Sequence, residues 1–157
     1  MIVAVGCDHA GFPLKERVIQ EVEAAGHTVV DCGTFDTAAA DYPDFARRVG
    51  EAVVAGSAER GIMVCGSGVG ASVAANKIPG VRAAPCHDTF SARQGVEDDD
   101  LNVLCLGARV VGPETAAEAV RAFLRARFSG AERHRRRVEK IRALERDARA
   151  GVFDRRG

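Results

Sequence analysis

The chain alternates short apolar runs, rich in β-branched residues, with longer stretches whose apolar residues recur at helical spacing. We expect strands at residues 2–6, 27–31, 61–64, 81–85 and 102–106. Helices are expected between them; the first two have Pro13 and Pro43 in their opening turns and stop at Gly26 and Gly56. This alternation predicts an α/β fold, in which a five-stranded parallel sheet carries helices on both faces and the crossovers are right-handed.

The later part of the chain continues the same pattern. A short helix is expected over about 88–95 and a longer one over about 114–128. The segment 132–149 is predicted to be a charged C-terminal helix with a thin apolar stripe, lying against the body or a second subunit. With 157 residues, the chain is expected to form a single domain over 1–157.

The balance of charge narrows the kinds of partner that the protein can have. Lys and Arg total 22, and Asp and Glu also total 22, so nothing indicates a nucleic-acid or membrane partner. No stretch is apolar enough to span a membrane, and the N-terminus lacks the basic segment of a secretory signal. The five cysteines contain no C-x-x-C pair, which argues against a disulfide framework and against a zinc site. We therefore expect a cytoplasmic protein with reduced thiols and a small-molecule partner.

The most informative motif is the turn 65–70, Cys-Gly-Ser-Gly-Val-Gly, between a predicted strand and a small-residue helix. Its glycines permit a tight turn whose backbone N–H groups, left without partners, point at an anion in front of the helix. The same groups would stabilise a thiolate at Cys65. The turn is therefore interpreted as an active site in which Cys65 acts as a base or a nucleophile.

The turn admits three other interpretations. Gly66, Gly68 and Ala71, with Asp88 downstream, satisfy a loose dinucleotide fingerprint, but the match falls on the third strand rather than the first. A Cys-loop phosphatase needs an arginine where Ala71 stands. A glycine-rich turn needed only for packing is the remaining alternative, and the polar residues at the other strand ends weaken it.

Polar residues follow the first predicted strand as well. Asp8 and His9 stand at its end, and the carboxyl ends of parallel strands meet at one edge, so we expect both near Cys65. The function of His87, after the fourth strand, is left open, and the remaining cysteines are interpreted as core residues. Arg133 and Arg137, four residues apart on one helix face, could grip a phosphate together.

Several motifs in one order resemble the family of ribose-5-phosphate isomerase B and the galactose-6-phosphate isomerase subunits. They are Gly6–Gly11, Asp41–Asp44, Cys65–Gly70, Ala74–Lys77, Asn102–Leu104 and Gly107–Val110. The resemblance runs from Met1 to about Leu144. It implies a Rossmann-like or flavodoxin-like three-layer sandwich, a homodimer with shared active sites that could pair into a tetramer, and isomerisation of a phosphorylated sugar without metal or cofactor.

The resemblance also assigns roles to individual residues. Cys65 would be the base that moves a proton between C2 and C1, and Ser67 would shuttle a proton between the two oxygens. The N–H groups of Gly66, Gly68, Val69 and Gly70 would hold the enediolate. Asp8 matches a position linked to ring opening. The positions associated with the substrate phosphate are His9, Arg109, Arg133 and Arg137, some of them supplied by the second subunit.

The sequence departs from the family at one place. Many members carry a histidine and Asn-Asp before the last strand, and the histidine is taken to help open the sugar ring; here residues 98–100 are three aspartates. Asp98 is therefore the candidate acid–base group and Asp99 a candidate substrate-binding residue. His87 could instead reach in, the substrate could need no ring opening, or the aspartates could form a solvated loop.

Three hypotheses about function follow. The first is interconversion of ribose 5-phosphate and ribulose 5-phosphate. The second is the same chemistry on a tetrose 4-phosphate or a hexose 6-phosphate. The third is a non-catalytic sugar-phosphate-binding protein, which the presence of Cys65 and Ser67 disfavours.

Overall fold

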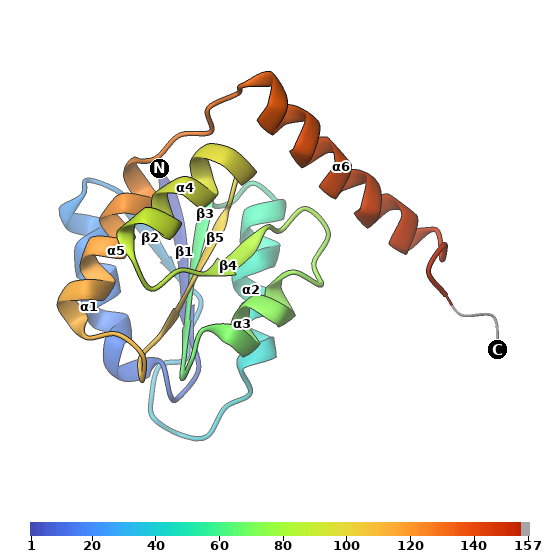
Figure 1. Ribbon diagram of the computed structural model, residues 1–157. Coiled ribbons are helices and arrows are strands. Elements are labelled where there is room, and N and C mark those ends of the chain that lie inside the picture. The colour runs from blue at the N-terminus through green and yellow to red at the C-terminus, as the bar shows by residue number, and fades with distance from the viewer. Residues whose placement is uncertain (155–157) are drawn as a thin grey trace.

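The computed structural model describes residues 1–154 and contains a five-stranded, all-parallel sheet in the order β2-β1-β3-β5-β4 (Figure 1). Its strands are β1 (Ile2–Cys7), β2 (Thr28–Asp31), β3 (Arg60–Cys65), β4 (Ala83–Pro85) and β5 (Val103–Gly107). Val5 pairs with Ile62, and Ile62 with Leu104, so the three central strands run in register. The predicted fold class is confirmed.

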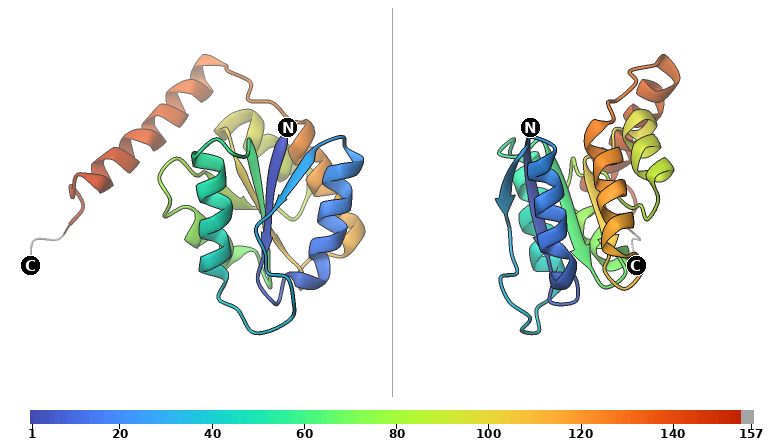
Figure 2. Two further views of the ribbon diagram at one scale, coloured as in Figure 1. Left: turned by 180° about the vertical axis from the view of Figure 1, so that it is seen from behind. Right: turned by 90° about the vertical axis from the view of Figure 1, so that its left-hand side faces the viewer.

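Helices cover both faces of this sheet (Figure 2). They are α1 (Phe12–Ala24), α2 (Tyr42–Val54), α3 (Val69–Ala75), α4 (Thr89–Asp99), α5 (Pro113–Arg125) and α6 (Glu132–Arg149). One core joins α1, α4 and α5 to one face, and a second joins α2 and α3 to the other. Alternate strand residues feed the two cores: in β3, Ile62 and Val64 face the first, and Met63 and Cys65 face the second.

Most predicted boundaries agree with the structure to within a residue or two, but α5 ends at Arg125 rather than near residue 128. Two other differences have a physical cause. α4 does not stop near Gly95 but continues to Asp99, because Gly95 keeps helical geometry and the helix closes at Asp100, which has a φ of +53°. β4 begins at Ala83 rather than Val81. The strand begins later in the sequence because the backbone N–H of Arg82 donates to the side chain of Asn102 rather than to a neighbouring strand. Asp98 and Asp99 therefore lie in the last turn of a helix, not in a loop.

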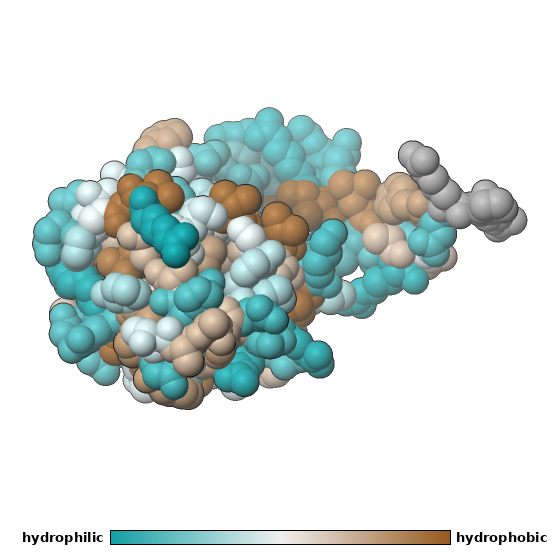
Figure 3. Space-filling view, turned by 90° about the horizontal axis from the view of Figure 1, so that it is seen from below, coloured by the Kyte–Doolittle hydropathy of each residue, from teal (hydrophilic) through white to brown (hydrophobic). Residues whose placement is uncertain are grey.

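α6 projects from the α4 side of the body as a separate arm (Figure 1). Only two of its residues, His134 and Val138, are buried. Between α6 and the body lies a cleft of about 880 Å³, lined by Val81, Leu101, Ile141 and Leu144 among others. Hydrophobic surface runs from the body along this helix (Figure 3). Among residues 1–154, no helix is both long and apolar enough to cross a membrane.

Candidate active site

The carboxyl ends of β1, β3 and β5 open into one cavity of about 390 Å³. Its walls are Asp8, His9, Ala10, Tyr42, Cys65, Gly66, Ser67, Gly70, Arg109 and Val110. Because the strands are parallel, each delivers the residue after its last one to the same edge of the sheet. The structure thus brings together seven of the residues singled out from the sequence: Asp8, His9, Cys65, Gly66, Ser67, Gly70 and Arg109.

The turn after β1 reaches the turn after β3 because residue 11 has no side chain. A Cβ at Gly11 would lie 2.2 Å from the carbonyl oxygen of Val64, so only glycine permits this backbone contact. The N–H of Gly11 donates to Oδ1 of Asp8 at 2.8 Å, and Asp8 is buried. One carboxylate oxygen of Asp8 is therefore fixed by the turn, which orients the carboxyl group beside the cavity.

The glycine turn after β3 is ordered by its own side chains. Gly68 has a φ of +79°, and its N–H donates to Sγ of Cys65 at 3.0 Å. The N–H of Val69 donates to Oγ of Ser67 at 3.2 Å. Two N–H groups that we expected to be free are thus engaged inside the turn. The contact from Gly68 places a hydrogen-bond donor directly on the sulfur of Cys65.

The turn after β5 is hydrogen-bonded to the glycine turn. The N–H of Ala108 donates to the carbonyl of Cys65 at 2.9 Å, and that of Arg109 donates to the carbonyl of Gly66 at 3.0 Å. A Cβ at Gly107 would lie 2.6 Å from the carbonyl carbon of Ser67, so the two turns pack backbone to backbone. The Arg109 side chain lies over Gly66, with Nη1 3.7 Å from the position of a Cβ there.

His9 faces the same cavity and is held from the far side by the loop after β2. Its Nδ1 lies 3.1 Å from both the N–H nitrogen and the carbonyl oxygen of Ala40. Nε2 is then the ring nitrogen left for a ligand in the cavity. A cationic guanidinium and an imidazole thus share a small, concave site with a thiol, which suits a ligand that is both anionic and a weak carbon acid.

Tyr42 is a cavity residue that the sequence reasoning did not select. Its ring covers Gly70 so closely that a Cβ there would lie 2.8 Å from the ring. Tyr42 opens α2, far from the glycine turn in sequence, so no local pattern links the two residues. Its place inside the Asp41–Asp44 motif was the one available signal.

His87 lies near the glycine turn, where its side chain accepts a backbone hydrogen bond. Its Nε2 accepts the N–H of Gly107 at 2.9 Å, and His87 does not line the cavity. Cys7, Cys86 and Cys105 are buried core residues: burial raises the pKa of the Cys7 and Cys86 thiols to about 11 and also raises that of Cys105. Cys32, also expected in the core, is only partly buried. All five cysteines are free thiols. Within residues 1–154, no three His, Cys, Asp or Glu side chains converge as metal ligands.

Four predicted site residues lie elsewhere. Asp98 and Asp99 end α4, whose N-terminus lies at the cavity edge of the sheet; ten helical residues carry Asp98 about 15 Å away, to the opposite edge. Arg133 and Arg137 lie on α6, whose His134 meets Asp98. We refer to Asp98, Asp99, Arg133 and Arg137, which lie on the neighbouring ends of α4 and α6 and apart from the Cys65 cavity, as the second cluster. Gly68 and Val69 belong to the glycine turn without lining the cavity.

Comparison with known proteins identifies the family. A family model described as Ribose/Galactose Isomerase matches residues 3–141. Ribose-5-phosphate isomerase B of Escherichia coli is 45% identical over 143 residues, covering 91% of this chain and 95% of the relative. D-erythrulose-4-phosphate isomerase of Pectobacterium atrosepticum is 41% identical over 130 residues, covering 82% and 85%.

The solved structures agree with this match. Ribose-5-phosphate isomerase B of Clostridium thermocellum superimposes with a TM-score of 0.92 and 44% identity, covering 94% of this chain and 99% of that one. The family model spans most of the chain, and the relatives are well above 30% identical over most of its length. The chain therefore belongs to the ribose/galactose isomerase family.

Proposed function

We propose that the protein interconverts ribose 5-phosphate and ribulose 5-phosphate, as the names of its ribose-5-phosphate isomerase relatives suggest. As a member of its family, it is an aldose–ketose isomerase of phosphorylated sugars. The observation that carries the proposal is the meeting of Cys65, with an N–H donor on its sulfur, and two anion-binding side chains in one cavity.

The reaction assigns a task to each group in the cavity. The Cys65 thiolate removes the proton from C2 of the open-chain aldose, and the electron pair of that C–H bond forms the enediolate. Uncommitted backbone N–H groups of the turn from Gly66 to Gly70 stabilise its oxygen. Ser67 passes a proton between the oxygens on C1 and C2, and the Cys65 thiol returns its proton to C1. No electron leaves the substrate, so the step needs no external oxidant or reductant.

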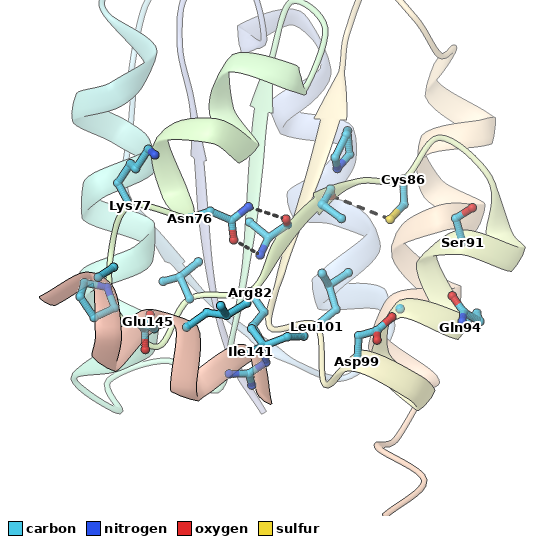
Figure 4. A pocket seen from close by; sticks show the side chains of 18 of the residues that line it. Asn76, Lys77, Arg82, Cys86, Ser91, Gln94, Asp99, Leu101, Ile141 and Glu145 are labelled. Carbon is cyan, nitrogen blue, oxygen red and sulfur yellow. Dashed lines mark hydrogen bonds between the residues drawn. The ribbon is translucent and has the colours of Figure 1, made fainter. Parts of the chain in front are cut away.

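The phosphate is proposed to bind at the His9 and Arg109 side of the cavity. Arg133 and Arg137 would complete the phosphate site, and the Asp99 side chain, which lines the α6 cleft, would face the sugar (Figure 4). Because the second cluster lies at the opposite edge of the sheet, it cannot reach the Cys65 of its own chain. We therefore propose a homodimer in which the second cluster of each chain completes the cavity of the other.

The surface of α6 supports this arrangement. Ile141 is 42% exposed and Leu144 59% exposed, although both belong to the apolar stripe. A second copy seated in the cleft would cover them and would carry its own cavity toward Arg133 and Arg137. A two-fold axis makes both sites equivalent. The five free thiols further support a reducing, cytoplasmic location.

The test of the function is initial-rate isomerisation of ribose 5-phosphate by the purified protein. We expect a kcat/KM of roughly 10⁴ M⁻¹s⁻¹ or more, in the ordinary enzyme range. Cys65→Ala should lower kcat by more than about a thousandfold while phosphosugar binding, followed calorimetrically, changes little. Turnover retained in that variant would refute Cys65 as the base, and tight binding without turnover in the wild type would indicate a non-catalytic binder.

A second candidate substrate is a four-carbon sugar phosphate. The observation that favours it is the aspartate at position 98, where the family commonly has its ring-opening histidine, together with the relative named for D-erythrulose 4-phosphate. A tetrose 4-phosphate cannot close a ring through its phosphorylated oxygen. Rates on erythrose 4-phosphate and on hexose 6-phosphates, measured beside ribose 5-phosphate, decide between the candidates.

A further inference from the structure

The carboxylate of Asp98 is committed to contacts within its own chain. Its Oδ1 lies 3.3 Å from Nδ1 of His134, and its Oδ2 accepts a hydrogen bond from Nε2 of Gln94 at 2.7 Å. Gln94 lies one turn earlier on α4, so it holds the carboxylate in one orientation. One oxygen therefore accepts a hydrogen bond, and the other lies beside the imidazole, before any substrate arrives.

His134 joins three segments at one point. It is 3% exposed, and its Nδ1 also lies 2.7 Å from Oγ of Ser129 in the segment that connects α5 to α6. That segment is tied to α4 as well, because the N–H of Ser129 donates to the carbonyl of Glu97 at 2.9 Å. The imidazole thus fastens the first turn of α6 to the last turn of α4.

The position of His134 on α6 determines where its neighbours point. Successive residues of a helix are separated by about 100° around its axis, so fixing residue 134 fixes the directions of Arg133 and Arg137. Val138 is the only other buried residue of α6, and it lies one turn further along the same face. The rest of the helix makes only exposed or peripheral contacts with the body, such as Oε1 of Glu145 accepting the N–H of Gly80 at 2.7 Å.

We propose that Asp98 and His134 are positioning residues that aim Arg133 and Arg137 at the substrate phosphate; this rests on the shared site of the proposed function. Arginine loses much side-chain entropy on binding, and a phosphate held by two arginines needs both in one geometry. A helix free to rotate would lose that geometry. In this chain Asp98 acts through the helix that it anchors rather than as the acid that opens a sugar ring.

The experiment compares Asp98→Asn and His134→Gln with the wild-type enzyme. Each variant weakens the contact between α4 and α6 without removing an arginine. We expect the KM for the sugar phosphate, and the inhibition constant of inorganic phosphate, to rise about tenfold, with kcat changed less than about twofold. The matched control is Glu139→Gln, a carboxylate on an exposed face of α6 outside both clusters, which should leave both constants unchanged.

A double-mutant cycle distinguishes a specific effect on the orientation of the two arginines from a general destabilisation of the fold. Once Arg137 is replaced by Ala, His134→Gln should raise the phosphate inhibition constant by clearly less than the tenfold expected in the wild type, because only Arg133 is left to be aimed. Fully multiplicative effects of the two substitutions would overturn the proposal. Circular dichroism and thermal unfolding identify any variant that fails to fold, and Asp98→Glu, which keeps the charge, should recover part of the affinity.

The alternative role of Asp98 gives a different pattern. If Asp98 were the ring-opening acid, Asp98→Asn would lower kcat for ribose 5-phosphate and spare erythrose 4-phosphate, and that outcome would also overturn the proposal. Aiming predicts the same loss of affinity for both sugars. Should the wild type isomerise no sugar phosphate, the proposed function fails, and calorimetric titration of inorganic phosphate into the same variants still tests the aiming of the two arginines.

Discussion

Close backbone contacts at two glycines, Gly11 and Gly107, determine how near the residues of the cavity lie to one another. The turn that carries Asp8 and His9 lies directly on the β3 backbone, because Gly11 leaves room for the carbonyl of Val64. The turns after β3 and β5 are in similar contact through Gly107. The cavity is therefore built from main chain in contact with main chain, and side chains cannot adjust to relieve a clash there.

The first prediction concerns Gly11. Gly11→Ala would drive its methyl group into the Val64 carbonyl, so we expect it to lower the free energy of unfolding by about 3 kcal/mol. Isomerase activity should fall further than stability explains, because Asp8 and His9 move with the turn. Gly112→Ser is the control, since that glycine has open space around it, a φ of −76° and an N-cap position that favours serine. Urea unfolding and initial rates check both variants, and a stable, active Gly11→Ala protein would contradict the contact.

The second prediction concerns pH. Burial raises the pKa of Cys7 and Cys86 from 9.0 to about 11, so the unfolded chain loses these protons first as pH rises. Their contribution to stability is complete below pH 9 and is lost between pH 9 and 11, by roughly 2 to 3 kcal/mol for each thiol. In the variant with Cys7→Ala and Cys86→Ala, unfolding free energy measured in urea should depend less steeply on pH in that window. An unchanged slope would show that other groups control alkaline unfolding.

Residue by residue, the sequence located the polar groups that follow strands, since a parallel sheet brings such positions to one edge. On that reasoning Asp8 and His9 were expected near Cys65, and the three residues line one cavity. Arg109, which lines it too, was named only through the family resemblance. Tyr42 could not be found in the same way, because it reaches the cavity by lying across Gly70 from another element. Contacts made by packing between helices leave no local pattern.

At the scale of elements, the edge strand β4 shows how the sheet ends. The side chain of Asn76 accepts the N–H of Ala83 at 2.8 Å and donates to its carbonyl at 2.7 Å (Figure 4). An amide thus imitates the neighbouring strand that β4 lacks on this side. An exposed edge is open to pairing with other chains, and this side chain occupies it.

The third prediction tests this cap. Asn76→Ala should cost about 1 to 2 kcal/mol and increase aggregation on heating, because both backbone groups of Ala83 lose their partner. Asn76→Asp should be no better, since a carboxylate can accept the N–H but repels the carbonyl. Lys77→Ala, at the next residue, should change the free energy of unfolding by less than about 0.5 kcal/mol. Chemical denaturation and light scattering provide the measurements, and equal effects at both positions would rule out a specific cap.

The elements themselves were largely predictable, because apolar periodicity is a property of the sequence within each one. The largest difference was in α4, which was predicted to end at about Gly95. In the structure this glycine lies inside the helix, and the side chain of Leu101 packs against it, 3.2 Å from the position of a Cβ. Tertiary packing outweighed the local preference, and the helix carried Asp98 to the far edge of the sheet.

At the scale of the whole molecule, the chain holds the Cys65 cavity and the second cluster far apart. The sequence reasoning assigned the residues of both to one active site, some of them from a second subunit, but it contained no distances between them. The separation follows from the direction of α4, which runs opposite to the strands, and from the outward course of α6. This separation is what the proposed homodimer would overcome.

The fourth prediction uses this separation. A Cys65→Ala chain and an Arg137→Ala chain should each be nearly inactive alone. If both are unfolded together and refolded as a mixture, half of the dimers are hybrids, and one of the two sites in each hybrid has an intact cavity and an intact second cluster. About a quarter of wild-type activity should then return. Mixtures that remain as inactive as their components would show that each site is made by a single chain.

The Cys65 cavity and the second cluster lie at opposite edges of the sheet, and in the proposed dimer this separation affects how the reaction rate depends on protein concentration. One folded chain would carry every chemical group of the reaction and still turn over almost nothing. Below the concentration at which dimers dissociate, the rate would rise with the square of the amount of protein rather than in proportion to it. The activity per chain would then depend on the protein concentration. It would be very low in dilute solution and would rise as the concentration approaches the dissociation constant of the dimer.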